Sequence, residues 1–181
     1  MQRLAAEGAT PRPESSSVEA SSREQIFLVF RLGDDEFGLP IESVVEVAQV
    51  PAQVTRLPKT PKFLEGVVNL RGEVLPVVDQ RRRFDMPALQ DRESRRLVVM
   101  KTERHRAGLI VDSVSDVLRI RAEHIEPPPN LTNDISRLVQ GVINLQASNR
   151  LVLLLDPTEV LTRAEQKLLD SFQAESKKAN A

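Results

Sequence analysis

The sequence contains the same pattern twice. Residues 36–47, EFGLPIESVVEV, align with residues 106–117, RAGLIVDSVSDV, with Gly, Leu, an aliphatic residue, an acid, Ser-Val, an acid and Val in common. Farther along, GVVNLRGEVLPVVD (66–79) aligns with GVINLQASNRLVLLLD (141–156), which shares the Gly, the Asn, two apolar runs and the final Asp. The offset between the copies grows from 70 to 75 and then to 77 residues, which places the insertions in loops. Two copies of one unit are therefore expected.

Each copy has the pattern of an all-β unit. An apolar strand, at 27–32 or at 97–102, is followed by the Gly-Leu strand with its acidic segment, a proline-bearing connection and the second hairpin. Turn residues between β-branched runs are typical of hairpins. About five short strands per copy are too few to bury the faces of an open sheet, which favours closure into a small barrel. We expect two similar five-stranded β-barrels, at about 26–85 and about 97–160, related by an approximate twofold axis.

The two ends of the chain differ in composition from the repeats. Residues 1–24 are rich in Ser, Ala, Glu and Pro, and they are expected to form a disordered arm because they have too little apolar surface to bury. Residues 173–181 are expected to form a disordered tail. A C-terminal helix is expected at about 157–172, with Asp156 as its N-cap, Pro157 in its first position and a leucine stripe packed on a barrel.

The composition excludes several classes of function. There is no Cys, so no disulfide, thiolate nucleophile or cysteine metal site can form, and the net charge of −1 demands no polyanionic partner. No signal-peptide core and no membrane-spanning apolar run is present, so we expect a cytoplasmic protein without membrane insertion. His105 and His124 are expected at the surface, and no hydrolase, metalloprotease or phosphate-loop motif occurs. The sequence therefore predicts no enzyme, no cofactor and no metal.

Residues that occur in both copies are best explained as scaffold, and residues in one copy only are candidates for function. The repeated glycines suit strand bends or close backbone contacts, and the repeated Asn69 suits a local turn hydrogen bond. Arg71 and Gly72 occur once, since the second copy has Gln146 and Ala147 instead. An arginine in an exposed turn is common, but Glu46 is placed where it could face Arg71, which would give an ordered ion pair beside a binding groove.

Four segments resemble the CheW family of bacterial chemotaxis coupling proteins. They are FLVFRLGDDEFGLPIESVVEV, VTRLPKTPKFLEGVVNLRGEVLPVVDQRRRF, GLIVDSVSDVLRIRAEHIEPPP and LVQGVINLQASNRLVLLLDPTEVL. The resemblance extends from about Gln25 to Phe172, and we expect one CheW-like domain at 25–172. It implies a pair of five-stranded β-barrels around a shared apolar interface.

The resemblance also implies partners and contact residues. Proteins of this family bridge the cytoplasmic tip of methyl-accepting chemoreceptors to the regulatory domain of the histidine kinase CheA, without catalysis, and other CheW-like domains are possible neighbours in arrays. One barrel is expected to hold the receptor and the other to pair with a kinase barrel. The positions that match family contact sites for receptor or kinase are Val44, Glu46, Gly66, Arg71, Gly72 and Val117.

Two segments depart from the family pattern. A glycine-rich turn is often present where this chain has QASNR, residues 146–150, and an aliphatic residue often follows the motif that ends at Asp79, where this chain has QRRRF, residues 80–84. The extra charge there could tune the identity of a partner.

Single-stranded nucleic-acid binding is the alternative from a different class. Small barrels often bind single strands, and basic runs occur at 81–83, 92–96 and 104–106. Such binding normally adds aromatic stacking platforms, but the chain has no Trp, no Tyr and six Phe. We therefore favour the adaptor.

Overall fold

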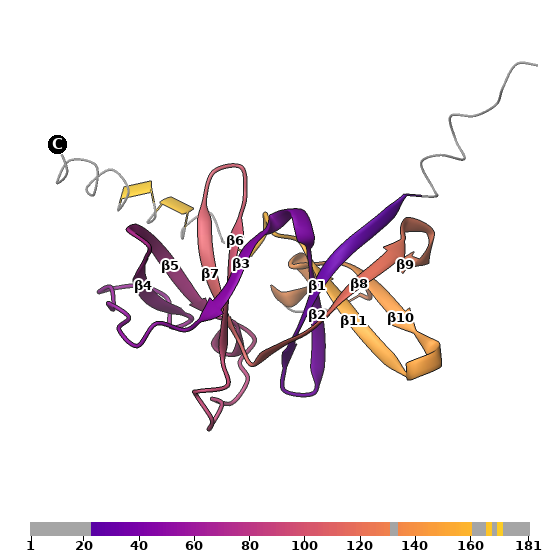
Figure 1. Cartoon of the computed structure of the whole chain (residues 1–181), viewed down its shortest axis with the longest axis horizontal. Helices are drawn as coiled ribbons and strands as arrows, with labels where there is room; N and C mark the ends of the chain where they lie inside the picture. Colours follow the sequence, from indigo (N-terminus) through magenta and orange to yellow (C-terminus); the bar gives the residue numbers. More distant parts are fainter. Residues whose placement is uncertain (1–22, 131–133, 161–165, 168–169, 172–181) are drawn as a thin grey trace, which may run out of the picture.

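Two β-sheets make up the molecule. The computed structural model describes residues 23–130, 134–160, 166–167 and 170–171. Eleven strands in this part of the chain form a six-stranded sheet, in the order β8-β1-β2-β11-β10-β9, and a five-stranded sheet, in the order β3-β6-β7-β5-β4 (Figure 1). The prediction of an all-β fold is confirmed.

The six-stranded sheet consists of β1 (Glu24–Leu32), β2 (Asp35–Pro40), β8 (Ser113–Arg121), β9 (Ile125–Glu126), β10 (Val139–Leu145) and β11 (Arg150–Leu155). The five-stranded sheet consists of β3 (Val44–Gln49), β4 (Leu64–Leu70), β5 (Glu73–Asp79), β6 (Arg96–Lys101) and β7 (Arg106–Val111). The short helices are η1 (Ile41–Ser43), α2 (Gln80–Arg83), η2 (Ala122–His124), η3 (Asp134–Arg137) and η4 (Gln146–Ser148).

The two repeats exchange their first hairpins. The β1–β2 hairpin lies in the sheet that β8 to β11 form, and the β6–β7 hairpin lies between β3 and β5. Apart from β9, the two strand orders are equivalent, because β8-β1-β2-β11-β10 in one sheet corresponds to β3-β6-β7-β5-β4 in the other. The expected boundaries of about 26–85 and about 97–160 were therefore wrong, since each sheet combines strands of both halves.

The short connections explain this exchange. Only η1 separates β2 from β3, and only Asp112 separates β7 from β8. If β1 paired with β3 of its own half, β2 and β3 would be parallel strands of one sheet, and such strands need a crossover of about a dozen residues. Three residues span at most about 10 Å, whereas a six-residue strand is about 20 Å long. The chain must therefore pass into the other sheet after each hairpin.

Strand pairing among the described residues does not close either sheet into a strict barrel, which corrects the expectation of two closed barrels. In the five-stranded sheet, β3 and β4 lie at opposite edges. Between them, the proline-bearing connection places Thr55 against Val67 of β4, with backbone hydrogen bonds of 2.9 and 2.8 Å. Thr55 thus takes a place on β4 that a pairing strand would need.

One apolar core joins the two sheets. It combines Leu28, Phe30 and Leu39 of the six-stranded sheet with Val98 and Leu109 of the five-stranded sheet, all 6% exposed or less. A smaller apolar cluster lies within each sheet. Because burying one such side chain stabilises the fold by about 1.5 to 3 kcal/mol, the shared cluster couples the two sheets. The shared apolar interface that the resemblance implied is confirmed.

The Asp that ends each repeated hairpin has a structural role. Asp79 caps α2, since its Oδ1 accepts hydrogen bonds from the backbone N–H groups of Arg81 and Arg82 at 3.0 and 3.3 Å. In the second copy, Asp156 Oδ1 accepts from the N–H of Thr158 at 2.9 Å. Side-chain oxygens at such positions satisfy amides that would otherwise lack a partner.

The C-terminal segment differs from its prediction. Pro157 does not begin a helix, because residues 157–159 form a turn that the Asp156 side chain stabilises. Residues 166–167 and 170–171 are helical, and the predicted apolar stripe of Leu161, Leu168 and Leu169 lies outside the described residues. The predicted disordered arm and tail also lie outside them, apart from Arg23 and Glu24 at the end of the arm.

His105 is buried, although the sequence placed it at the surface. The residue is 6% exposed, and its Nε2 lies 3.6 Å from Oδ1 of Asp170. The β6–β7 turn is tight, with the N–H of Thr102 donating to the carbonyl oxygen of His105 at 2.8 Å. The C-terminal segment therefore contacts the β6–β7 turn. His124 has a 62% exposed side chain, as predicted.

Candidate partner-binding site

The β4–β5 turn presents Arg71 in a fixed position. Leu70 and Glu73 are paired across the hairpin, and the two residues between them have positive φ, 52° at Arg71 and 83° at Gly72. Two such residues are typical of a type I′ hairpin turn. Asn69 Oδ1 accepts a hydrogen bond from the N–H of Gly72 at 2.9 Å, as the repeated Asn predicted. The turn therefore has one defined backbone conformation.

Arg71 forms the ion pair that the sequence suggested. Its Nη1 lies 2.6 Å from Oε2 of Glu46 on β3, with the Arg71 side chain 77% exposed and the Glu46 side chain 23% exposed. The other carboxylate oxygen of Glu46, Oε1, is buried and accepts no hydrogen bond from the described residues. The pair connects the turn to the edge strand β3, and it leaves guanidinium donors facing solvent.

Exposed apolar side chains occur on β3 and β5, the strands next to this ion pair. On β3, burial alternates between partly buried and exposed positions, and Val45 and Val47 are 40% and 42% exposed. Val74, next to the Arg71 turn on β5, is 46% exposed. Val44 is partly buried and packs against the shared core. An oriented charge beside exposed apolar side chains is a common composition for a protein interface.

The two predicted glycines have different surroundings. Gly66 is buried with φ of 148°, and a Cβ at this position would collide with the backbone carbonyl of Thr55. Gly72 has no atom within 4 Å of an added Cβ, so only its positive φ constrains it. Gly66 thus shapes the site through the backbone, whereas Gly72 lies in the exposed turn.

Val117 lies in the other sheet, on β8 opposite Leu28 of β1. It is 52% exposed. The structure brings Arg71, Gly72 and Glu46 together in the five-stranded sheet, with Val44 on the same strand as Glu46, but it does not add Val117 to this group. The predicted contact residues therefore belong to two surfaces.

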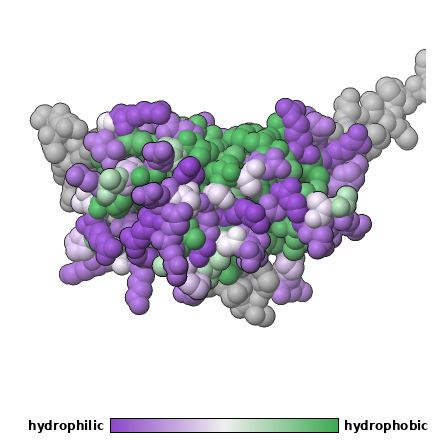
Figure 2. Space-filling view, turned by 60° about the horizontal axis from the view of Figure 1, so that its bottom comes forward, coloured by the Kyte–Doolittle hydropathy of each residue, from purple (hydrophilic) through white to green (hydrophobic). Residues whose placement is uncertain are grey.

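Four of the exposed apolar side chains form two pairs at equivalent positions of the repeats. Val47 corresponds to Val117, and Val74 corresponds to Leu151, which is 54% exposed. Sequence reasoning missed Val45, Val47, Val74 and Leu151, although the aligned repeat shows apolar residues at two equivalent pairs of positions. Figure 2 shows apolar surface across the middle of the molecule, with polar side chains on both sides. Each sheet thus has exposed apolar side chains of its own.

The second hairpin has no counterpart of the Arg71 turn. Its loop forms η4, followed by Asn149 with φ of 52°, and it begins at Gln146. Arg150, after this loop, lies 3.6 Å from Asp116, the residue equivalent to Glu46. The acid on the edge strand is therefore paired in both copies, but only the first copy uses an arginine at the tip of the turn.

The arginines at 81–83 contact their own chain. Arg81 donates two hydrogen bonds of 2.6 Å to the carboxylate of Asp112, Arg82 pairs with Glu65 at 2.9 Å, and Arg83 lies over the ring of Phe63. The sequence suggested that the charge of these arginines could influence which partner binds, but their side chains interact within the chain. These contacts also weaken the nucleic-acid alternative, because the guanidinium groups of Arg81 and Arg82 are already paired with carboxylates.

Asp112 connects the two sheets at this point. Its Oδ2 also accepts a hydrogen bond of 2.6 Å from the N–H of Gly33 in the β1–β2 turn. Burial by itself would raise the pKa of Asp112, but the hydrogen bonds from Arg81 and Gly33 outweigh it and hold the pKa below its usual value. The carboxylate is therefore charged and stabilising at neutral pH.

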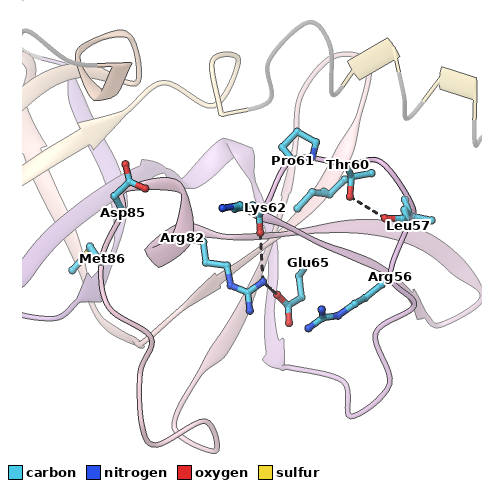
Figure 3. Close-up of a pocket in the computed structure, with 10 residues that line it drawn as sticks. Arg56, Leu57, Thr60, Pro61, Lys62, Glu65, Arg82, Asp85 and Met86 are labelled. Carbon is cyan, nitrogen blue, oxygen red and sulfur yellow. Dashed lines mark hydrogen bonds and ion pairs between the residues drawn. The ribbon is translucent and has the colours of Figure 1, made fainter.

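A polar pocket of about 530 Å³ lies between the β3–β4 connection and the end of α2 (Figure 3). Arg82 and Glu65 pair within it, while the side chains of Arg56 and Lys62 form no hydrogen bond or ion pair with the described residues. Leu57 and Met86 contribute the apolar part of the lining.

The described residues contain no cluster of three or more acidic or histidine side chains that could hold a metal. They also contain no helix that is long and apolar enough to cross a membrane.

Comparison with known proteins assigns the family. The sequence profile of the CheW-like domain matches residues 27–165. The chain belongs to the CheW-like domain family. The chemotaxis protein CheW of Klebsiella aerogenes is 35% identical over 157 residues, which cover 86% of this chain and 93% of that protein. FrzA of Myxococcus xanthus is 34% identical over 155 residues, 86% of this chain and 96% of FrzA.

The fold is also similar to a solved member of the CheW-like family. The scaffolding protein TtCheW from Thermoanaerobacter tengcongensis superposes with a TM-score of 0.67 and 29% sequence identity. The match covers 82% of this chain and 91% of TtCheW.

Proposed function

We propose that this CheW-like protein is a non-catalytic adaptor that couples methyl-accepting chemoreceptors to the histidine kinase CheA. In this proposal it acts in the cytoplasm and is recruited to membrane-associated receptor arrays. Its family and its similarity to a CheW scaffolding protein support an adaptor role. The single structural observation that carries the proposal is the Arg71–Glu46 pair, which fixes an exposed guanidinium in the turn before the exposed Val74 of β5.

The Arg71 surface suits the receptor tip. Arg71 sits in a turn with a defined backbone, and Glu46 holds its side chain at one end. A guanidinium held in this way offers several donors in a fixed geometry, so less conformational entropy is lost on binding. Val74, next to the Arg71 turn, would add apolar contact, which supplies affinity, while the charge supplies orientation.

The other sheet suits a different partner. Val117 and Leu151 are exposed there, and a barrel of the CheA regulatory domain, or another CheW-like domain in an array, could pack on them. Buried side chains of both sheets pack into one core, so the two sheets are expected to move as one rigid body. A displacement of the receptor on one surface would then move the kinase on the other, without any chemistry in the adaptor.

Substitution of Arg71 tests this proposal. Arg71→Ala should fold normally, because its side chain is exposed, and should bind a receptor cytoplasmic fragment about tenfold more weakly or worse, as expected for loss of an oriented charge at an interface. The measurement is a titration by calorimetry, with thermal melts to verify folding.

Gln146→Ala is the matched control, because Gln146 is the first residue of the equivalent loop. It should leave receptor affinity unchanged. Equal affinity of Arg71→Ala and wild type would contradict the proposal, and so would equal losses in both variants.

A further inference from the structure

Two ion pairs at equivalent positions of the repeats have opposite charge order. In the six-stranded sheet, Arg150 of β11 donates two hydrogen bonds of 2.8 Å to the carboxylate of Glu36 on β2. In the five-stranded sheet, Arg106 of β7 donates one of 2.8 Å to Glu73 of β5. Glu36 is aligned with Arg106, and Glu73 with Arg150. The acid and the base have therefore exchanged places between the two sheets.

The strands that carry these pairs have the same register. The parallel pair β2–β11 places Gly38 opposite Leu154, and the parallel pair β7–β5 places Gly108 opposite Val77, which are the aligned residues of the repeat. In both sheets, the pair joins the hairpin from one repeat to a strand of the other repeat. The two ion pairs thus lie at equivalent positions of the parallel strand pair that joins the hairpin of one repeat to the other repeat.

A second copy of the chain could compete for this contact. The first repeat of one copy could exchange hairpins with the first repeat of another, and the two second repeats could do the same. The short connections after β2 and β7 would not prevent this, because each chain would still pass from one sheet to the other after its hairpin. The apolar contacts would be similar in kind, with Gly38 opposite Val77 instead of Leu154.

We propose that the inverted ion pairs prevent like repeats of two copies of the chain, first with first and second with second, from exchanging hairpins. In such a dimer, Glu36 would face Glu73, and Arg106 would face Arg150, and each contact would occur twice. Glu36 is opposite Val152 in the register, so residue 150 reaches it diagonally from two positions away. Long side chains still meet at this spacing, and like charges there repel. Glu36 is only 10% exposed at its side chain, so water would screen its repulsion poorly. Pairing of a first repeat with a second repeat matches all of these charges, whereas pairing of two first repeats or of two second repeats does not.

A double charge reversal tests the proposal. Glu73→Arg combined with Arg106→Glu keeps an ion pair in the five-stranded sheet of the monomer, and both positions are about half exposed. In the exchanged dimer, however, the two variant residues would now face Glu36 and Arg150 with opposite charge. After unfolding and refolding at high protein concentration, the dimer fraction should be about tenfold higher than in wild type or more, as measured by size-exclusion chromatography with light scattering.

The quadruple variant is the matched control. Adding Glu36→Arg and Arg150→Glu to the double variant restores the inverted order, so the protein should be monomeric again. A double variant that refolds as a monomer, or a quadruple variant that dimerises equally, would overturn the proposal.

If the double variant does not fold, the salt dependence of wild-type refolding tests the proposal instead. Refolding in about 1 M salt shortens the screening length to about 3 Å. It should raise the dimer fraction over that at low salt, because the Arg106 and Arg150 side chains are 47% and 31% exposed and salt can screen their mutual repulsion. An unchanged fraction would overturn the proposal.

Discussion

At the scale of single residues, Asp112 combines two constraints. It is the whole connection between β7 and β8. Its carboxylate accepts hydrogen bonds from Arg81 of α2, which follows β5, and from the Gly33 amide in the β1–β2 turn of the other sheet. The side chains of Arg81 and Asp112 are 14% and 13% exposed. A charge pair with so little exposure is costly to break, because the remaining charge is left without a partner.

Asp112→Asn should lower the free energy of unfolding by about 2 to 4 kcal/mol at pH 7. The folded-state pKa of Asp112 is lowered, so its stabilisation is complete above the unfolded value of about 3.9 and is lost as the pH falls through the folded value. Urea unfolding between pH 7 and pH 2 should therefore show a smaller acid-induced loss of stability in the variant than in wild type.

Glu73→Gln is the control, because its ion pair with Arg106 is about half exposed. It should cost about 1 kcal/mol or less at pH 7. If the free energy of unfolding changed with pH in the same way in wild type and in Asp112→Asn, Asp112 would not be responsible for the acid-induced loss of stability.

Some of these residue contacts could be predicted and others could not. The Arg71–Glu46 pair was predictable, because Arg71 occurs in one copy only and Glu46 lies in the preceding strand segment. The burial of His105 was not, because its ring is near Asp170, which is distant in sequence. The same holds for Arg81 and Asp112, whose pairing depends on where the two sheets meet.

At the scale of elements, the connection before β4 supports the Arg71 hairpin. Thr55 pairs with Val67, and this contact is possible only because Gly66 has no side chain. Gly66→Ala should lower the free energy of unfolding by about 2 kcal/mol or more, since it combines strained φ with a backbone collision. Chemical denaturation measures this loss.

Gly72→Ala is the comparison within the same hairpin, since an added Cβ there meets no atom within 4 Å. It should cost about 1 kcal/mol, from backbone strain alone. A larger loss for Gly72→Ala than for Gly66→Ala would mean that the turn, and not the Thr55 contact, holds the hairpin.

The order of the strands could not be predicted from the repeat alone. Two contiguous halves and two halves with exchanged hairpins contain the same residues in the same local patterns, so periodicity does not distinguish them. The signal that was available is the length of the connections. Residues 41–43 and residue 112 are too few for a crossover between parallel strands.

At the scale of the whole molecule, the exchanged hairpins and the shared core make each sheet depend on the other. Leu109 is fully buried in the shared cluster with Leu39 of the other sheet. Leu109→Ala should cost about 2 to 5 kcal/mol and should increase amide hydrogen exchange in both sheets alike. Exchange confined to β3 to β7 would show that the two sheets unfold separately.

The exchange of hairpins also has a consequence for protein synthesis. The β1–β2 hairpin leaves the ribosome early, but its neighbours β8 and β11 end at Arg121 and Leu155. At roughly 5 to 20 residues per second, the more than 100 residues between Pro40 and Leu155 take on the order of ten seconds to translate. The first hairpin has no neighbouring strand of its own sheet until β8 is translated, and β2 lacks its neighbour β11 until the chain reaches Leu155. The nascent chain therefore has to be protected from aggregation until translation is nearly complete.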